Sequence, residues 1–195
     1  MPKQVDPQEK RRALIAACIE LIAIEGLPAT TLRRVAQQAG CTTGTLTHYF
    51  ANRDELLIST LRTVHRQAAQ RMQDIARAEH NPALHLQRVL EESLPLHPTA
   101  LQEWKVWLTF WASSMTSTAL TQENTKRYAE WRHLLSTLLQ DVNNQLNVEL
   151  ESRMLVSFVD GLGVTVARQS GLKPIQAAQQ ECRELLAGYL QRLLG

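Results

Sequence analysis

Hydrophobic residues recur every three or four positions along most of the chain, which is the spacing of one face of an α-helix. In the first such segment, residues 7–26, the shared face contains Leu14, Ala17, Cys18, Leu21 and Ile22. Alternating Val, Ile and Thr runs joined by hairpin dipeptides, which are typical of strands, are missing from the sequence. The pattern therefore predicts an all-α protein.

Capping residues, prolines and glycines mark where these helices begin and end. The first helix is expected to have Asp6 as its cap and Pro7 as its first residue. Further along, Thr99 and Gln102 have the spacing of a capping box, which predicts a helix start after the stretch PLHP. About nine helices are expected, over residues 7–26, 31–40, 43–50, 53–78, 82–94, 99–114, 119–144, 149–170 and 174–194.

The second and third helices are short, and only Cys41 separates the glycine stop at Gly40 from the next cap, Thr42. Two short helices joined by a sharp turn that contains glycine are typical of the helix-turn-helix. The sequence therefore predicts a three-helix helix-turn-helix DNA-binding domain over residues 1–52 and a larger helical body over residues 53–195.

The third helix has one apolar side and one side of short polar residues. Leu46 and Phe50 lie four residues apart and are expected to face the core, so the threonines point elsewhere. Short side chains let a helix settle in the major groove of B-DNA, which is about 12 Å wide, and the free N–H groups at the helix start suit a phosphate. The candidate DNA contacts on this helix are Thr42, Thr43, Gly44, Thr45, Thr47, His48 and Tyr49.

Basic residues are concentrated towards the N-terminus of a chain whose net charge is only +2. Residues 1–77 hold 11 Lys and Arg against 7 Asp and Glu, whereas residues 78–195 hold 10 against 12. Sequence-independent attraction to DNA phosphates can come from Arg11, Arg12, Arg33, Arg34 and Arg53. Threonine caps and solvated arginines also occur in proteins that bind no nucleic acid. A helical protein-interaction adaptor and a small all-α enzyme therefore remain alternatives.

The stretch TTLRRVAQQAGCTTGTLTHYFANRDEL resembles the DNA-binding region of the TetR family of one-component repressors, and the resemblance extends over residues 10–60. It implies a ligand-responsive repressor of transcription, not an enzyme, which binds double-stranded operator DNA. Thr47 departs from the family pattern, because many members have tyrosine there. The DNA contacts that the resemblance implies are Thr31, Thr42, Thr43, Thr45, His48, Tyr49 and Arg53.

Aromatic residues are concentrated in the middle of the body. Trp104, Trp107 and Trp111 lie on one face of one helix, and Tyr128 and Trp131 follow on the next. Such a stripe is either ordinary core or the wall of a ligand site, and aromatic faces attract quaternary ammonium ions.

The segments EWKVWLTFWASSM and VDGL resemble the BetI branch of TetR regulators, whose members respond to choline-related osmolytes. This resemblance implies a small, cationic, choline-like effector. Gly163 stands where close BetI relatives are expected to have tryptophan, which implies a larger cavity or a different ligand. The residues expected near the effector are Trp104, Trp107, Trp111, Tyr128, Trp131 and Asp160.

The last two predicted helices have broad apolar faces. Together these faces are larger than the apolar surface that a single helical body is expected to bury. Two chains are therefore expected to join these helices into a four-helix bundle, making a homodimer, although burial of both faces within one chain is the alternative. The candidate dimer contacts are Phe158, Leu162, Cys182, Leu185 and Tyr189.

Other kinds of site have little support in the sequence. The three cysteines form no CxxC pair, and the histidines form no HExxH cluster, so no metal site and no cofactor are expected. The N-terminus leads into no uncharged apolar run, so neither a signal peptide nor a membrane span is expected, and a cytoplasmic location fits best.

Overall fold

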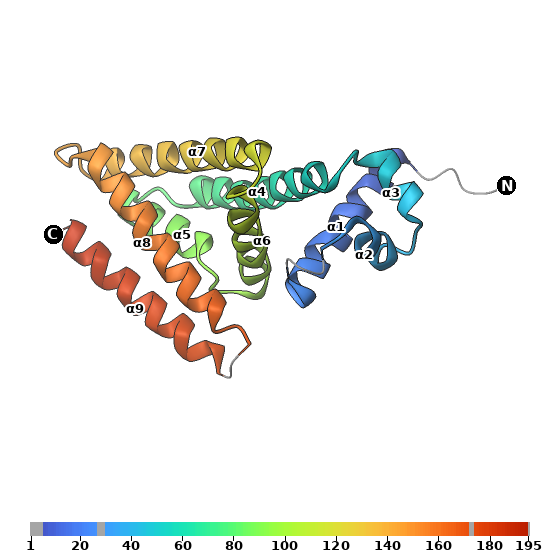
Figure 1. Cartoon of the computed structure of the whole chain (residues 1–195). Coiled ribbons are helices and arrows are strands. Elements are labelled where there is room, and N and C mark those ends of the chain that lie inside the picture. The colour runs from blue at the N-terminus through green and yellow to red at the C-terminus, as the bar shows by residue number, and fades with distance from the viewer. Residues whose placement is uncertain (1–5, 27–29, 172–173, 195) are drawn as a thin grey trace. The chain divides into compact units, whose positions relative to one another are not determined.

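The computed structural model describes residues 6–26, 30–171 and 174–194, and these residues form nine α-helices and no strand (Figure 1). This confirms the predicted all-α class. The helices are α1 (Pro7–Glu25), α2 (Leu32–Gln38), α3 (Thr43–Tyr49), α4 (Arg53–Ala78), α5 (Pro82–Ser93), α6 (Pro98–Ser114), α7 (Thr118–Val142), α8 (Val148–Arg168) and α9 (Ile175–Leu194).

The starts of the first four helices are set by local caps. The Asp6 carboxylate accepts a hydrogen bond from the backbone N–H of Gln8 at 3.0 Å, and Pro7 is the first helical residue. Thr31 and Thr42 cap α2 and α3 in the same way. At α4, Asn52 accepts from the N–H of Glu55 at 2.8 Å. These side chains satisfy N–H groups that have no partner inside the helix.

The predicted capping box at Thr99 and Gln102 is wrong. Helix α6 begins earlier, at Pro98, and the Nδ1 atom of His97 accepts a hydrogen bond from the N–H of Ala100 at 3.2 Å. Proline suits the first helical position because its fixed φ is already helical and it has no N–H to leave unpaired. The helix therefore extends back to Pro98, and His97 takes the capping role.

The described residues divide into two compact units. The head unit contains the residues up to Arg66 together with Lys105–Asn124, and the body unit contains Gln67–Trp104 together with the residues from Thr125 onward. The chain passes from one unit to the other inside α4, α6 and α7. The predicted boundary at residue 52 lies within the head unit and stays a prediction.

The core of the head unit joins α1, α2 and α3 to the first half of α4 and to part of α6. Leu14 of α1, Leu46 of α3 and Leu61 of α4 are fully buried in it, as is Phe50 directly after α3. The two short helices of the helix-turn-helix are therefore held by long-range hydrophobic packing, since a helix of seven residues is unstable alone.

The body unit has a separate core. It contains Leu86 and Leu90 of α5, Leu135 of α7, Leu155 of α8 and Leu186 of α9, all almost completely buried. Helices α8 and α9 lie side by side in Figure 1. No helix among the described residues is long and apolar enough to cross a membrane.

Candidate DNA-binding and ligand-binding sites

Helix α3 has the two different sides that its sequence predicts. Leu46 is completely buried, and so is Phe50, the residue that ends the helix. Thr43, Gly44, Thr47 and His48 are exposed, whereas Thr45 and Tyr49 are half-buried. The exposed side therefore consists of short side chains, with His48 near the C-terminal end of the helix. Short side chains allow a helix to enter a DNA groove.

Most of the threonine hydroxyls of α3 already take part in hydrogen bonds within the helix. The hydroxyl of Thr42 accepts from the N–H of Thr45 at 3.1 Å and lies 3.0 Å from the Thr45 hydroxyl. The hydroxyl of Thr47 donates to the carbonyl of Gly44 at 3.1 Å. Among the described residues, Thr43 makes no such bond, so its exposed hydroxyl is the one most available to a base edge.

No neighbouring atom in the fold is so close to Gly44 that a side chain would be excluded there. A Cβ atom added there would meet only the hydroxyl oxygen of Thr42, at 3.7 Å, which is an ordinary contact. Glycine inside a helix costs about 0.5 to 1 kcal/mol relative to alanine. A glycine at this exposed position fits close approach of a partner to the backbone of α3.

The arginines of the head unit differ in how firmly they are held. The Nε atom of Arg53 donates to the carbonyl of Thr30 at 2.8 Å, next to the cap of α2. Arg11 lies 4.8 Å from the centre of the Phe50 ring and donates to the hydroxyl of Ser59 at 2.7 Å. Both therefore stabilise the head unit itself, a role that the sequence did not indicate for Arg11.

The other candidate cations of the head lie nearer to solvent. Arg34 forms an ion pair with Glu25 and donates to the side chain of Gln37 at 2.8 Å, so a phosphate would compete with Glu25 for it. Arg33 is exposed, and Arg12 is separated by 4.0 Å from Asp6.

The predicted ligand-binding aromatics do not all belong to one unit. Trp107 and Trp111 are in the head unit, where the Trp107 ring meets the ring of His65 edge-on at a centroid distance of 6.4 Å. Trp107 also packs against the head core. The remaining members of the set lie in the body unit: Trp104, Tyr128, Trp131 and Asp160.

Trp104 is a tightly packed residue of the body unit. It is only 5% exposed, and its indole N–H donates to the carbonyl of Ser93 at 2.8 Å. A Cβ atom added to Gly163 would lie 2.0 Å from two carbon atoms of this ring. The expectation of a larger cavity at Gly163 is therefore wrong at that position, because the indole of Trp104 fills the space that a side chain would take.

Asp160 is a half-buried residue of α8, three positions before Gly163 and its contact with Trp104. The hydroxyl of Tyr128 donates to its Oδ2 atom at 2.7 Å. Burial raises the pKa of Asp160, while the hydrogen bond from Tyr128 opposes the rise. Burial and the neighbouring carboxylate raise the pKa of Tyr128, which keeps this phenol a donor. The result is a half-buried carboxyl group whose charged form a nearby cation would stabilise.

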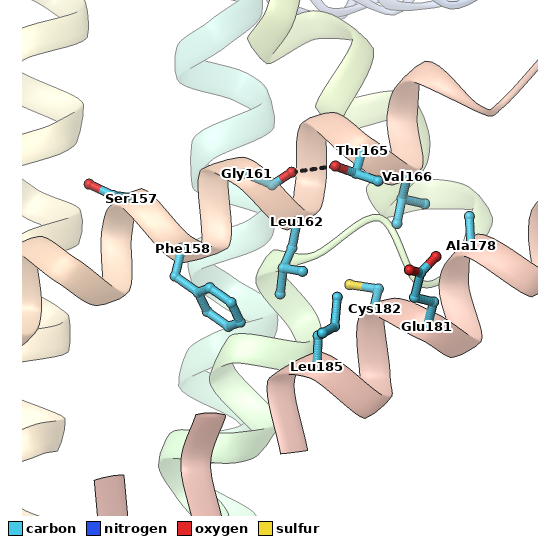
Figure 2. Close-up of a pocket in the computed structure, with 10 residues that line it drawn as sticks. All are labelled: Ser157, Phe158, Gly161, Leu162, Thr165, Val166, Ala178, Glu181, Cys182 and Leu185. Atoms are coloured by element: carbon cyan, nitrogen blue, oxygen red, sulfur yellow. Dashed lines mark hydrogen bonds between the residues drawn. The ribbon is translucent and has the colours of Figure 1, made fainter. Parts of the chain in front are cut away.

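The predicted dimer contacts line or adjoin a groove between α8 and α9. Figure 2 shows Phe158 and Leu162 of α8 pointing toward Cys182 and Leu185 of α9. The groove has a volume of about 340 Å³. The Phe158 ring stacks on the ring of Tyr189 with 4.7 Å between centroids.

The apolar surface continues beyond the groove. Leu185, which lines the groove, is 49% exposed, and Leu150 and Met154, nearer the start of α8, are each 50% exposed. Leu162 and Cys182, by contrast, are almost fully covered by their own chain. Half-exposed apolar residues on the same two helices as an apolar groove are typical of an interaction surface.

Two known families match this chain, one over the DNA-binding helices and one over the C-terminal region. The family described as "Bacterial regulatory proteins, tetR family" matches residues 14–60, which include α2, α3 and the start of α4. The family described as "BetI-type transcriptional repressor, C-terminal" matches residues 82–195. The chain belongs to the TetR family. Its C-terminal region is of the BetI type.

Curated relatives extend this match over most of the TetR-family chain. The transcriptional regulator BetI of Paraburkholderia xenovorans is 34% identical over 168 residues, covering 83% of this chain and 84% of the relative. The regulator PksA of Bacillus subtilis is 24% identical and covers 99% of this chain and 94% of its own. These relatives are transcriptional regulators, and the chain is accordingly a ligand-responsive, DNA-binding regulator of transcription.

Solved structures share the fold. A transcriptional regulator from Rhodococcus sp. superposes with a TM-score of 0.81 at 26% identity, covering 93% of this chain and 96% of that one. A regulator from Saccharomonospora viridis in complex with choline also has a TM-score of 0.81, at 20% identity, covering 92% of this chain and 96% of that chain.

Proposed function

We propose that this TetR-family regulator is a repressor that binds its operator as a homodimer and releases it when a small cation binds the body unit. The proposal that the protein binds DNA rests on the exposed side of α3. Thr43 and Gly44 lie there above a buried Leu46, so the helix presents backbone and short side chains to a groove.

In the proposed complex, α3 lies in the major groove and Thr43 reads base edges, while the remaining residues hold the phosphate backbone. Phosphate contacts fix the position of a protein on DNA, and base contacts supply specificity. The proposed contact set is Thr31, Arg33, Arg34, Thr42, Thr43, Gly44, Thr45, Thr47, His48, Tyr49 and Arg53.

The proposed dimer interface is the outer face of α8 and α9. A second copy of the chain would cover the half-exposed Leu150, Met154 and Leu185 and place side chains in the groove between the two helices. A two-fold axis brings the same surface of both chains together, which suits an apolar patch that is complementary to itself. The interface residues proposed from the sequence are Phe158, Leu162, Cys182, Leu185 and Tyr189.

The proposed effector is a small organic cation of the choline class. Asp160 supplies a half-buried negative charge, with one oxygen held by Tyr128, and Trp104 and Trp131 belong to the same unit. A cation over an aromatic ring gains about 0.5 to 2 kcal/mol, and pairing with a partly desolvated carboxylate adds to this. The choline bound to the structural neighbour from Saccharomonospora viridis supports the same ligand class.

The test is selection of bound duplexes from a random pool at low ionic strength, followed by footprinting on the selected site. We expect a site with dyad symmetry whose half-sites are about one helical turn, or 34 Å, apart. We also expect affinity to fall steeply with salt, because bound phosphates release counterions. Titration with choline should then release the DNA. A protein-interaction adaptor would instead show no salt-dependent affinity for any duplex.

A further inference from the structure

Helix α1 ends on an acidic residue, Glu25, and has no basic residue in its last turn. The final carbonyl groups of a helix have no partner inside it and give that end a partial negative charge, so a carboxylate there is unfavourable for the helix itself. The basic residues of α1, which are Lys10, Arg11 and Arg12, all lie near its start. The head unit therefore has a negative charge at the end of α1, the helix against which α2 packs.

Glu25 holds the side chain of one of the proposed DNA contacts. Its carboxylate accepts a hydrogen bond from a terminal nitrogen of Arg34, with which it forms an ion pair. The other terminal nitrogen of Arg34 donates to the side-chain oxygen of Gln37 at 2.8 Å. Each terminal nitrogen of this guanidinium therefore already donates to an acceptor of the protein, and Glu25 is the charged one of the two acceptors.

Arg34 lies next to other proposed DNA contacts at the start of α2. Its backbone N–H donates to the hydroxyl of Thr31, the cap of this helix, at 3.2 Å. The carbonyl of Thr30, the residue before that cap, accepts a hydrogen bond from Nε of Arg53 at 2.8 Å. Thr31 and Arg53, to which the proposed function assigns DNA contacts, are thus both neighbours of the turn that carries Arg34.

The ion pair of Arg34 with Glu25 is too exposed to contribute much to folding. The two side chains are 37% and 35% exposed, and exposed ion pairs stabilise a protein little because water and salt screen them. In the same unit, Glu123 accepts two hydrogen bonds from Arg62 and is only 6% exposed. A phosphate can therefore displace Glu25 from Arg34 at little cost to the fold.

We propose that Glu25 limits the affinity of the head unit for DNA, because it competes with a phosphate for Arg34. In the free protein the guanidinium pairs with Glu25, and in the complex it turns to a phosphate, so the loss of the Glu25 pair weakens binding. A guanidinium binds carboxylate and phosphate through the same planar fork, so this exchange needs only a rotation of the side chain. Glu25 itself contacts no DNA. This inference rests on the proposed DNA contacts of the head unit.

The test is Glu25→Gln in the full-length chain, which removes the charge but keeps the size of the side chain and an acceptor oxygen. Affinity is measured by fluorescence anisotropy with the selected operator duplex and with an unrelated duplex of the same length. We expect affinity to rise about two- to fivefold on both duplexes, because a phosphate contact reads no sequence. The midpoint of urea unfolding should stay nearly unchanged. A residue that only held the fold together would instead lower affinity when it was replaced.

A double-mutant cycle identifies the partner through which Glu25 acts. In an Arg34→Gln background, the gain from Glu25→Gln should fall to the gain that Glu20→Gln gives in the native chain. Glu20 is the matched control, because it lies on the same helix but accepts a hydrogen bond from the neutral Gln38 of the head unit, at 3.2 Å. A full gain in the Arg34→Gln background would mean that Glu25 acts by general repulsion of DNA, and it overturns the proposal.

Ethylation interference on the selected operator tests the exchange directly. Arg34→Gln should abolish interference at a phosphate in each half-site, and Glu25→Gln should strengthen it at that same phosphate. Interference patterns that are identical in the native chain and in both variants overturn the proposal.

The same measurements separate this inference from the proposed function. If neither the native chain nor any variant binds a duplex with salt-dependent affinity, the proposed DNA contacts are wrong, and the role of Glu25 is wrong with them. If the native chain binds but Glu25→Gln raises affinity no more than Glu20→Gln does, the role of Glu25 alone is overturned.

Discussion

Replacing Gly44 by alanine should make the protein more stable and at the same time weaken its binding to DNA. Gly44 is exposed in the first turn of α3, and the added Cβ would contact only the Thr42 hydroxyl, at 3.7 Å. No atom of the protein has to move. The substitution therefore tests the DNA-binding surface without damaging the fold.

The stability effect follows from the conformational freedom that glycine loses on folding. Alanine in place of glycine in an unstrained helical position stabilises a protein by about 0.5 to 1 kcal/mol. For a chain of this size, 1 kcal/mol corresponds to a rise in Tm of about 2 to 4 °C. Thermal or urea unfolding of the Gly44→Ala variant measures this directly.

The effect on DNA binding should have the opposite sign. If the backbone at Gly44 lies against bases or phosphates, a methyl group has no room, and affinity for the selected operator should fall by about 1 to 3 kcal/mol, or roughly 5- to 150-fold. Fluorescence anisotropy with a labelled duplex measures this loss. A variant that is more stable and binds the operator as tightly as the native chain would refute the placement of α3 in the groove.

Four further predictions concern the DNA contacts, the effector site, the α6 cap and the dimer. Thr43→Ala should change base preference in a repeated selection, whereas Arg53→Ala should weaken binding evenly across sequences and lower the salt slope by about one unit, unless circular dichroism shows the head unfolded. Asp160→Asn should abolish choline binding in calorimetry. Because burial raises the pKa of this carboxyl in the folded state, stability should fall as pH rises from the ordinary aspartate range through the raised pKa, and the Asn variant should lack this decline. His97→Ala should cost about 0.5 to 2 kcal/mol in urea unfolding through loss of the α6 cap, and His97→Asn should restore most of it; equal stability of both variants would argue against the cap. Leu185→Glu should convert the dimer to monomer in sedimentation analysis, and an unchanged mass would exclude the α8–α9 face as the interface.

The all-α class, the starts of α1 and α3 and the two sides of α3 could be predicted from the sequence, whereas the predicted cap of α6 was wrong. The caps at Asp6 and Thr42 join atoms two or three residues apart, and the burial of Leu46 and Phe50 follows from their spacing of four. These features depend on groups within one helical turn, so local residue order is enough to define them.

Other features were decided only by the tertiary structure. The sequence offers Arg11 as a positive charge for DNA phosphates, but only the structure shows that it donates to Ser59, 48 residues away, and lies over the ring of Phe50. The sequence places Trp104 on an aromatic helix face, but only the structure shows that its ring packs beside Gly163 and that its N–H donates to the carbonyl of Ser93.

Lys105 shows the limit of sequence reasoning most clearly, because nothing in its neighbourhood along the chain points to the carbonyl of Ala23, 82 residues earlier. A long cationic side chain on a helix surface has many possible partners of similar energy. Which one it takes depends on the helix brought next to it by hydrophobic packing. The sequence alone therefore determined where the helices form and which sides are apolar, whereas packing in three dimensions determined the partners of Arg11, Trp104 and Lys105.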